Sequence, residues 1–328
     1  MIDRLRYGKP VSADRVLNHL IAWTAILLVL SVLGFGGYYY YDRLPGSTGP
    51  TPAQRTITVA EDAVNADPSA LTPRLALADV YYAANRFKES AEQYQAALGI
   101  DDKNLLATWG LGRALLAMGD GNGAEPNFQK VLDASQNADI RGDLVGASYF
   151  YLGKIALSRN DADSAIGNFK SAVAIDRADA DAMQLLGVAY LAKGSYDDAI
   201  EQLKKAIRFV PNFTEAYTQL ALAYDGKGLA NEARYAKGME LFSQGQVDKA
   251  AKEMEATVAA LPSFADGFTG LGLIREKQGQ RSKAIDAYQQ ALALDANNFT
   301  ARYGLTRLGV VQPTDTTNTH GSSEGGSQ

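Results

Sequence analysis

The chain has 328 residues, of which 46% are hydrophobic and 21% are charged, and its formal net charge is −5. This mildly acidic charge is spread along the sequence and leaves no basic footprint for nucleic acid, so we expect no nucleic acid partner. The sequence has no cysteine, which excludes disulfides and thiolate metal sites, and neither of its two histidines, His19 and His320, lies where a general base would help.

The first predicted element is a membrane-spanning helix. The segment from Leu20 to Tyr40 contains no charged residue, and about 20 apolar residues are needed to cross a bilayer. A buried core helix would need a polar face, which this segment lacks. A cleaved signal peptide is the rival interpretation, but its apolar region usually runs roughly 7 to 15 residues before a small-x-small site. Gly34-Phe35-Gly36 is a weak version of such a site, so we predict an uncleaved anchor at residues 20–41.

The charges that flank this segment predict its orientation. Basic residues remain on the cytoplasmic side of a membrane, and more of them precede the segment (Arg4, Arg6, Lys9 and Arg15) than follow it (Arg43 and Arg55). We therefore expect a single-pass protein of the cell membrane, with residues 1–19 cytoplasmic and the rest of the chain extracytoplasmic. Tyrosines 38–41 match an interfacial aromatic belt, and residues 42–52 are expected to form a Pro/Gly spacer.

A pattern with a period near 34 residues occupies most of the remaining chain. Leu-Ala or Leu-Gly pairs open each copy, at Leu77-Ala78, Leu111-Gly112, Leu186-Gly187 and Leu271-Gly272. Each pair is followed at the same distance by a residue suited to a turn, at Asn85, Gly119, Gly194 and Gly279. Such a period is typical of stacked helical hairpins, in which a small residue lets two helices approach and glycine accepts a positive φ at the turn.

The pattern resembles the tetratricopeptide repeat (TPR) family, of the membrane-anchored bacterial type. The resemblance implies an all-α solenoid of helical hairpins over residues 53–311, with about six to seven repeats behind one N-terminal transmembrane helix. The complete units are expected at 71–104, 105–138, 146–179, 180–213 and 265–298.

Three segments outside these units have their own predictions. Residues 53–68 look like the second helix of a unit that lacks its first helix, and Phe299–Leu308 looks like a first helix that caps the stack. Between the second and third units the phase shifts by seven residues, which we expect to lengthen a helix or a loop within 134–143. Residues 312–328 have nothing to bury and are expected to be a disordered tail.

The pattern also breaks between residues 214 and 264. A unit begins with Leu220 and a turn at Gly228, but the pattern restarts only half a period later, with a turn at Gly245. Either one helix is missing, or the segment Asn231–Gln244 serves two units. We predict a half-repeat phase break near 231–245, with a local change in curvature or handedness.

No motif in the sequence predicts catalysis. Gly110-Leu111-Gly112 and Gly270-Leu271-Gly272 look like the start of a dinucleotide loop, but the third glycine is missing and both fall where the helices of a repeat cross. Asp120–Gly123 lacks the glutamate that closes a calcium loop. We therefore expect no catalytic residue, no metal, no cofactor and no small-molecule substrate.

In the TPR family, the first helix of each hairpin lines a concave groove that binds a partner. Carried over by position, the resemblance implies a groove formed by Asp79, Tyr82, Trp109, Arg113, Leu116, Phe150, Lys154, Leu157, Gln184, Tyr235, Met239 and Phe242. Aromatic residues and arginine dominate binding hot spots, but helix spacing alone does not separate a groove residue from one packed between helices. For Trp109 and Phe150 both interpretations stay open. The carboxylate clamp of TPR co-chaperones is absent, because its lysine and asparagine positions hold other residues.

These features predict a non-catalytic, membrane-anchored scaffold or assembly factor that binds a protein or peptide partner in its groove. The anchor would confine the groove to a thin layer and raise its effective concentration. Two alternatives remain: a receptor for an envelope polymer or glycan, and a regulatory subunit of a membrane enzyme complex. Self-association into a homo-oligomer also stays open.

Overall fold

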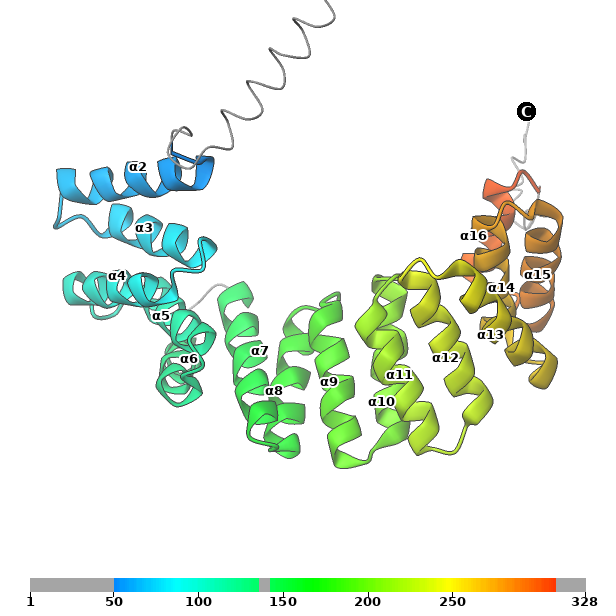
Figure 1. Cartoon of the computed structure of the whole chain (residues 1–328). Coiled ribbons are helices and arrows are strands. Elements are labelled where there is room, and N and C mark those ends of the chain that lie inside the picture. The colour runs from blue at the N-terminus through cyan, green and yellow to red at the C-terminus, as the bar shows by residue number, and fades with distance from the viewer. Residues whose placement is uncertain (1–49, 136–141, 311–328) are drawn as a thin grey trace, which may run out of the picture. The chain divides into compact units, whose positions relative to one another are not determined.

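The computed structural model describes residues 50–135 and 142–310, and in these residues it contains α-helices and no strand (Figure 1). The predicted all-α fold is therefore confirmed for the described part of the chain. The helices are α2 (Pro52–Ala66), α3 (Leu71–Ala83), α4 (Phe87–Ile100), α5 (Leu105–Ala117), α6 (Gly121–Ser135), α7 (Gly142–Ser158), α8 (Ala162–Ile175), α9 (Ala180–Lys193), α10 (Tyr196–Phe209), α11 (Thr214–Gly226), α12 (Ala230–Ser243), α13 (Val247–Ala260), α14 (Ala265–Lys277), α15 (Arg281–Leu294) and α16 (Phe299–Arg307).

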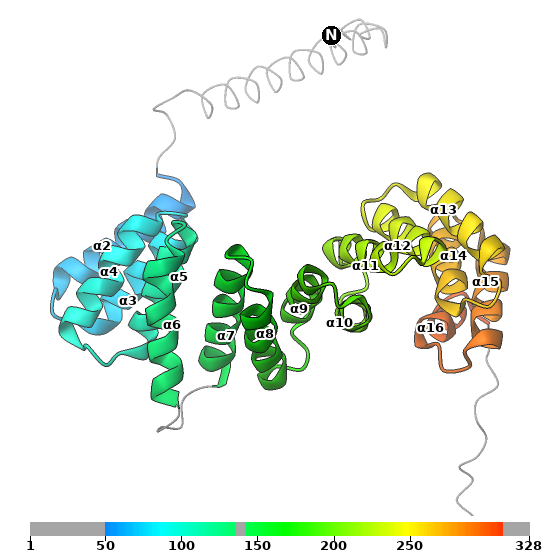
Figure 2. The ribbon, with the colours of Figure 1, turned by 90° about the horizontal axis from the view of Figure 1, so that it is seen from below.

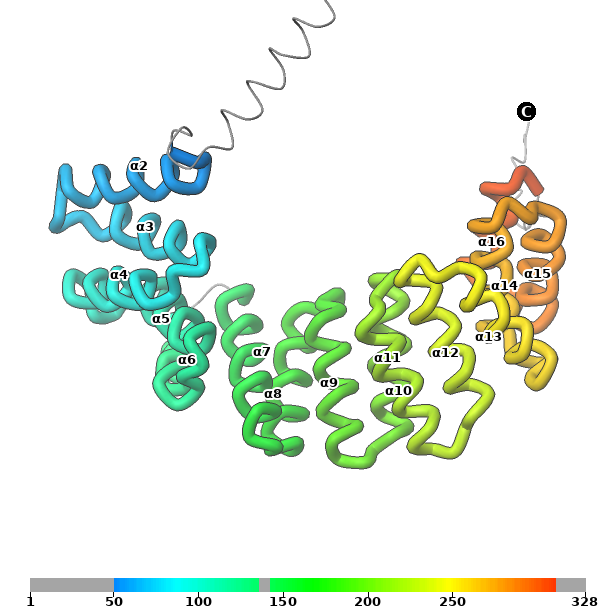
Figure 3. The backbone as a smooth tube through the Cα atoms, in the orientation of Figure 1, coloured from blue at the N-terminus to red at the C-terminus, as the bar shows by residue number. Residues whose placement is uncertain are grey.

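The chain divides into two compact units, one that ends at Ile100 and one that begins at Asp101. In the first unit, α3 packs against both α2 and α4. In the second unit, each helix from α5 to α16 packs against the next one along the chain, and the backbone reverses direction at each turn (Figures 2 and 3). Alternate helices also touch, as α7 does with α9, so the second unit is a row of hairpins in which each one is buried by its neighbours.

Side chains and turn residues set where the helices begin and end. Thr51 and Gln54 form a reciprocal capping box at α2, and asparagine or aspartate caps α5, α8, α9 and α16 through the side chains of Asn104, Asp161, Asp179 and Asn298.

The ends of the helices distinguish first helices from second helices. A residue with positive φ follows each of α3, α5, α7, α9, α11, α12, α14 and α16, at Asn85, Gly119, Asn160, Gly194, Gly228, Gly245, Gly279 and Gly309. No such residue follows α4, α8, α10, α13 or α15. A left-handed residue closes a helix and allows the chain to reverse at once, so this signal marks the turn inside a hairpin.

The two helices of a hairpin cross where a glycine of the first helix faces a large side chain of the second. A Cβ added to these glycines would lie within 3.4 Å of the partner side chain. The pairs are Gly112 with Phe128, Gly153 with Phe169, Gly187 with Leu203, Gly238 with Met254, and Gly272 with Tyr288. Since every partner lies sixteen residues after its glycine, the repeat places a large residue opposite each gap.

Helix α12 occupies the segment where the sequence pattern breaks phase, near residues 231–245. It packs against α11 on one side, where Thr214 Oγ1 and Ser243 Oγ are 2.8 Å apart, and against α13 on the other. Its turn at Gly245 and its crossing glycine, Gly238, are those of a first helix. The structure thus has the arrangement in which the segment Asn231–Gln244 serves two units.

The phase shift between the second and third units lengthens a helix. Helix α7 begins at Gly142, four residues before the predicted start of its unit at residue 146. Helices α2 and α16 lie where a second helix at 53–68 and a capping first helix at 299–308 were predicted, and the residues before α2 and after α16 lie outside the described ones.

The described helices include none with the length and apolar character needed to cross a bilayer. The predicted cytoplasmic segment 1–19, the anchor at 20–41, most of the spacer at 42–52 and the tail at 312–328 lie outside the described residues.

Candidate partner-binding site

Three first helices carry an aromatic residue followed one turn later by a cation. The side chains in each pair lie together on one helical face, because residues four apart are neighbours there. The cation lies 4.6 Å from the ring centroid for Arg113 and Trp109, 5.7 Å for Lys154 and Phe150, and 5.2 Å for Arg307 and Tyr303. These are cation–π distances, and two of the three pairs consist of residues predicted for the groove.

The aromatic residues of the first two pairs line a cavity of about 300 Å³ in the second unit, between α5, α7, α8 and α9. Its aromatic wall is formed by Trp109 of α5 and by Phe150 and Tyr151 of α7. Small residues, Gly146 and Ala147 of α7, leave the space open on the side that faces α8.

The aromatic rings hold one another in place. Tyr151 stacks on Phe128 at 5.1 Å between centroids and lies 6.0 Å from Trp109, while Phe150 meets Phe169 edge to face at 5.9 Å. Trp109 and Phe150 are each only partly buried. Both interpretations left open by the sequence therefore hold at once: these rings pack between neighbouring helices and also line a cavity.

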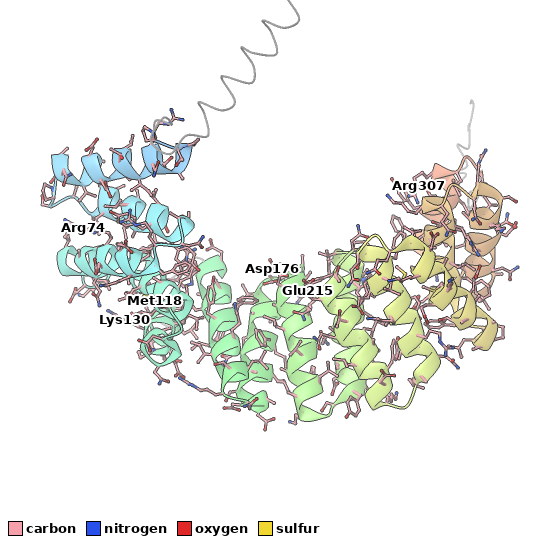
Figure 4. The ribbon with its side chains drawn as sticks, viewed as in Figure 1. Arg74, Met118, Lys130, Asp176, Glu215 and Arg307 are labelled. Carbon is pink, nitrogen blue, oxygen red and sulfur yellow. The ribbon has the colours of Figure 1, made fainter. Side chains whose placement is uncertain are left out.

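Four carboxylates are among the described residues that line the cavity, and none of those described residues is basic. Asp143 belongs to the first turn of α7 and Asp181 to the first turn of α9. Asp176, which Figure 4 labels, and Asp179 lie in the turn between α8 and α9. Asp179 Oδ1 accepts a hydrogen bond from Ala182 N at 2.8 Å and so caps α9.

The carboxylates do not form a metal centre. In residues 50–135 and 142–310, no group of three histidine, cysteine, aspartate or glutamate side chains is arranged to hold an ion. The electrostatic character of the cavity is that of an acidic rim around an aromatic wall.

The indole nitrogen of Trp109 is the second polar feature of the wall. Trp109 Nε1 is buried and has no hydrogen-bond partner among the described residues. A buried N–H group without a partner costs free energy, and here it belongs to a ring that lines open space.

The remaining predicted groove residues are not gathered at this cavity. Asp79, which accepts a hydrogen bond from Tyr94 Oη, and Tyr82, which packs edge to face on Phe87, belong to the first unit. Leu116 packs partly buried against the cluster around Phe128, and Leu157 packs against the larger core cluster.

The residues predicted from α9 and α12 lie in the interior instead of on a groove surface. Gln184, Tyr235 and Met239 are only 8%, 9% and 3% exposed, and Phe242 packs partly buried against the same core. On α12, Tyr235 and Met239 belong to the core cluster, and this helix contacts α14 as well as α11 and α13.

Burial also changes the chemistry of the tyrosines around α12. Burial raises the pKa of Tyr235, Tyr217 and Tyr224 well above the ordinary value near 10, and the negative charge of Asp266 acts in the same direction. Tyr235 meets Phe264 edge to face at 5.1 Å. These hydroxyls remain neutral at physiological pH and act as packing groups.

Sequence reasoning missed the acidic half of the cavity, namely Asp143, Asp176, Asp179 and Asp181, and also Tyr151. A signal was present, since three aspartates fall within six residues at the junction of two units. Aspartate is so common at helix starts, however, that this spacing predicts a cap before it predicts a site.

Family models for tetratricopeptide repeats match most of the chain. One TPR repeat model matches residues 187–228, a second tetratricopeptide repeat model matches 104–178, and a third matches 57–105, 235–299 and 269–308. No curated protein sequence matches the chain at a significant level.

Solved structures with a similar chain trace include a crystal structure of MamA protein, which is 26% identical. The match covers 59% of this chain and 94% of that one, with a TM-score of 0.46. The C-terminal part of a TPR repeat-containing protein from Cytophaga hutchinsonii is 17% identical, with coverage of 77% and 94% and a TM-score of 0.49. YrrB, described as a TPR protein with an unusual peptide-binding site, is 16% identical, with coverage of 76% and 99% and a TM-score of 0.44.

Proposed function

Because the chain belongs to the tetratricopeptide repeat family, we propose that it is a non-catalytic scaffold that holds a protein or peptide partner at the cavity between α5, α7, α8 and α9. The observation that carries this proposal is the cavity itself, where Trp109, Phe150 and Tyr151 form an aromatic wall beneath an acidic rim. Aromatic side chains with a few polar groups are the usual composition of a recognition pocket.

The size of the cavity fits a side chain of a partner and not a folded domain. Its volume of about 300 Å³ is at the lower end of ligand pockets. A partner would therefore insert one anchor side chain here and extend along the neighbouring first helices, where the exposed Lys154 offers a further polar contact.

We also propose that residues 20–41 anchor the scaffold in the cell membrane, with residues 1–19 cytoplasmic, 42–52 as a spacer and the repeats at 53–311 extracytoplasmic. The uncharged segment from Leu20 to Tyr40 and the basic residues before it support this arrangement. Confinement near the membrane would let a modest affinity suffice.

Site-directed crosslinking in intact membranes tests the binding site. A photo-crosslinking amino acid replaces Ala147, which lines the cavity, or Gly167, which is exposed on α8 with open space around its Cβ position. We expect a discrete protein adduct from position 147 and not from position 167. Equal adducts at both positions would contradict the site, and an adduct with envelope polymer would favour the receptor alternative over the scaffold.

The absence of cysteine from the sequence makes the topology testable. A membrane-impermeant maleimide should label Ser282→Cys, on the exposed start of α15, in intact cells or spheroplasts. It should label Ser12→Cys, in the predicted cytoplasmic segment, only after permeabilisation. The reverse pattern would overturn the proposed orientation, and release of the unlabelled chain by a carbonate wash would overturn the anchor.

A further inference from the structure

We propose that two copies of this chain associate head to tail, with α2 of one copy packed against α16 of the other. The two helices would then form a hairpin of the kind that recurs within each chain. This contact uses none of the residues that line the cavity, so its test is independent of the scaffold proposal. Three observations carry it: the exposure of the two helices, the sizes of their crossing residues and their charges.

Helix α2 exposes positions that are buried in the second helices of the hairpins. Thr56 and Ala63 are exposed, and Val59 is 69% exposed; these three residues are the open face of α2. The counterparts of Thr56 in the hairpins are 0% exposed, namely Ser90, Ala124, Ala165, Ala199, Ala250 and Ala284. The counterparts of Ala63 are 0–2% exposed, namely Ala97, Val131, Ala172, Ala206, Thr257 and Ala291.

The position of Thr56 is one that meets the first helix of a hairpin. Its counterpart Ser90 donates a hydrogen bond from Oγ to the carbonyl oxygen of Ala78 on α3, at 2.8 Å. The other side of α2 is covered, because Val64 packs with Leu77 of α3 in one apolar cluster. The open face of α2 is therefore the side on which the hairpins have their first helix.

Helix α16 shows the corresponding exposure at the other end of the described chain. Phe299 is 76% exposed, and Arg302 and Thr306, one and two turns later, are exposed as well; these three residues are the open face of α16. The counterparts of Thr306 in the first helices are buried, namely Ala78, Gly112, Gly153, Gly187, Gly238 and Gly272. Because the second helix crosses at this position in the hairpins, the open face of α16 is the side on which a second helix packs.

The sizes of the crossing residues fit a pair of α16 and α2. Within a hairpin, a glycine faces a large side chain, as Gly272 faces Tyr288. Helix α2 has Ala60 at the position of the large side chain, and α16 has Thr306 at the position of the glycine. The larger residue is thus on the first helix and the smaller one on the second, the reverse of the usual order. Thr306 would occupy space over Ala60 that a large side chain of the second helix fills elsewhere.

The charges of the two open faces are complementary. Arg302 lies on the open face of α16, and Asp62 is exposed one turn after Val59 on α2. In the hairpin of α12 and α13, the counterpart of Arg302 reaches across to the second helix, since Arg234 Nε lies 3.7 Å from Glu253 Oε2. The position of Glu253 corresponds to that of Val59, so Arg302 of one copy would reach the carboxylate of Asp62 in the other.

The other charges of these helices do not oppose the contact. Glu61 accepts a hydrogen bond from Tyr81 Oη at 2.6 Å, and Arg307 is held by Glu276. Arg55 lies near the start of α2 and, in an antiparallel pair, would lie far from Arg302. A contact between two different surfaces joins copies into open rows or rings. One helix pair is smaller than a standard interface, so the test captures the contact covalently in the membrane.

The test uses the full-length chain, which has no cysteine. One copy carries Ala60→Cys, a differently tagged copy carries Thr306→Cys, and membranes with both are treated with a mild oxidant. A disulfide requires Cα atoms within about 7 Å, so we expect a linked dimer that contains both tags. Thr58→Cys is the matched control, because it is exposed and its counterparts Glu92 and Glu201 are exposed in the hairpins. It should give less than about a fifth of the dimer.

Charge reversal tests the pairing of Asp62 with Arg302. Asp62→Arg in the copy with Ala60→Cys should lower the yield of dimer about fivefold, because it places two cations together. Adding Arg302→Asp to the other copy should restore the yield. Glu92→Arg, at an exposed position of α4, is the control and should change nothing. Circular dichroism confirms that each variant is folded.

Equal yields from positions 58 and 60 would overturn the inference, and so would a dimer formed by Thr306→Cys alone, which would place two α16 helices together. A chain with both Ala60→Cys and Thr306→Cys should form dimers and longer species. A disulfide within one such chain would overturn the contact between copies. If Arg302→Asp does not restore the yield, the proposed register of the two helices is wrong.

Discussion

Glu276 of α14 holds Arg307 of α16 in a two-point ion pair, with Nε 2.5 Å from Oε1 and Nη2 2.6 Å from Oε2. Helix α15 lies between them in the sequence, and its Tyr288 donates a third hydrogen bond, from Oη to Glu276 Oε2 at 2.9 Å. One carboxylate therefore ties the last helix of the described chain, which carries Arg307 (Figure 4), to the hairpin of α14 and α15. A helix at the end of a solenoid has a neighbouring hairpin on one side only. The ion pair therefore adds stabilisation that a further packed helix would supply elsewhere in the row.

The ion pair predicts a pH-dependent contribution to stability. Hydrogen bonds from Arg307 lower the pKa of Glu276 below its ordinary value of 4.5 and outweigh its partial burial. Because the folded-state pKa is lowered, the stabilisation is present above about pH 4.5 and is lost as the pH falls through the lower folded value. Glu276→Gln should reduce the free energy of unfolding by about 1 kcal/mol at pH 7.

Denaturant titrations of the wild type and Glu276→Gln at several pH values between 7 and 3 measure this difference, which should shrink below pH 4.5. The control is Glu201→Gln, which breaks an exposed pair with Lys205 on α10 and should change stability by less than about 0.5 kcal/mol. A difference between wild type and Glu276→Gln that stays constant down to pH 3 would contradict the assignment.

The crossing glycines predict a graded series of alanine substitutions. At Gly272 a Cβ would lie less than 3.0 Å from the ring of Tyr288, which is fully buried and has no room to move, whereas at Gly238 it would meet the flexible end of Met254 at 3.3 Å. Gly272→Ala should therefore destabilise the fold by about 1–3 kcal/mol, and Gly238→Ala should cost less.

Gly167→Ala is the matched control, because this glycine lies within α8 and nothing lies within 4 Å of its Cβ position. It should stabilise the fold by about 0.5–1 kcal/mol, since alanine loses less conformational entropy than glycine in a helix. Thermal unfolding followed at 222 nm ranks the three variants. An equal loss from Gly272→Ala and Gly238→Ala would show that the partner side chain does not set the cost.

The tyrosines around α12 predict sensitivity to alkali. Burial raises the pKa of Tyr217, Tyr224 and Tyr235 in the folded chain above the ordinary value near 10. A raised folded-state pKa gives stability that is complete below pH 10 and is lost as the pH rises further, because the unfolded chain then releases protons that the folded chain retains.

In a pH jump to 11 or 12, tyrosinate absorbance near 295 nm should therefore rise in two phases. Exposed tyrosines ionise at once, and the buried ones ionise together with the loss of helical signal at 222 nm. Tyr235→Phe should make the slow phase smaller, while Tyr303→Phe, at an exposed position on α16, should reduce only the fast phase. A slow phase that is unchanged in Tyr235→Phe would count against burial as the cause.

Helix α12 also contains a sheltered ion pair. The side chain of Glu240 is 11% exposed, lies 2.9 Å from Lys237 Nζ and accepts a hydrogen bond from Gln244 Nε2 at 3.1 Å. Lys237→Met would leave the carboxylate without its cation and should destabilise the fold by about 1–3 kcal/mol. Adding Glu240→Gln should restore part of the loss, because a neutral amide needs no counter-charge. If the double variant is less stable than Lys237→Met alone, the carboxylate is not the source of the cost.

Much of the fold could be predicted because the same local sequence pattern recurs in each repeat of the chain. The turns at Asn85, Gly119, Gly194 and Gly279 were predicted from residue type, and all four have positive φ in the structure. The glycines at 112, 187 and 272 were predicted where helices cross, and each faces a large side chain sixteen residues later. These features depend on contacts within one hairpin, which the spacing of residues along the chain specifies directly.

The candidate site could be predicted only in part. Trp109, Arg113, Phe150 and Lys154 were expected on one surface, and the structure places both aromatic–cation pairs beside the same cavity. The acidic rim was not predicted, because it combines residues of several helices that the sequence separates. Tyr235 and Met239 had the spacing of groove residues but are buried.

By itself, the sequence determined the hairpin, its turn, its crossing point and the apolar face of each helix, because these follow from residue type and a period near 34. The tertiary structure decided which neighbour covers each face. Periodicity reports that a helix has an apolar side but not how many helices share it, so only the packing could show that α12 lies between two partners and that Asp143 and Asp181 meet the ring of Trp109 at one cavity.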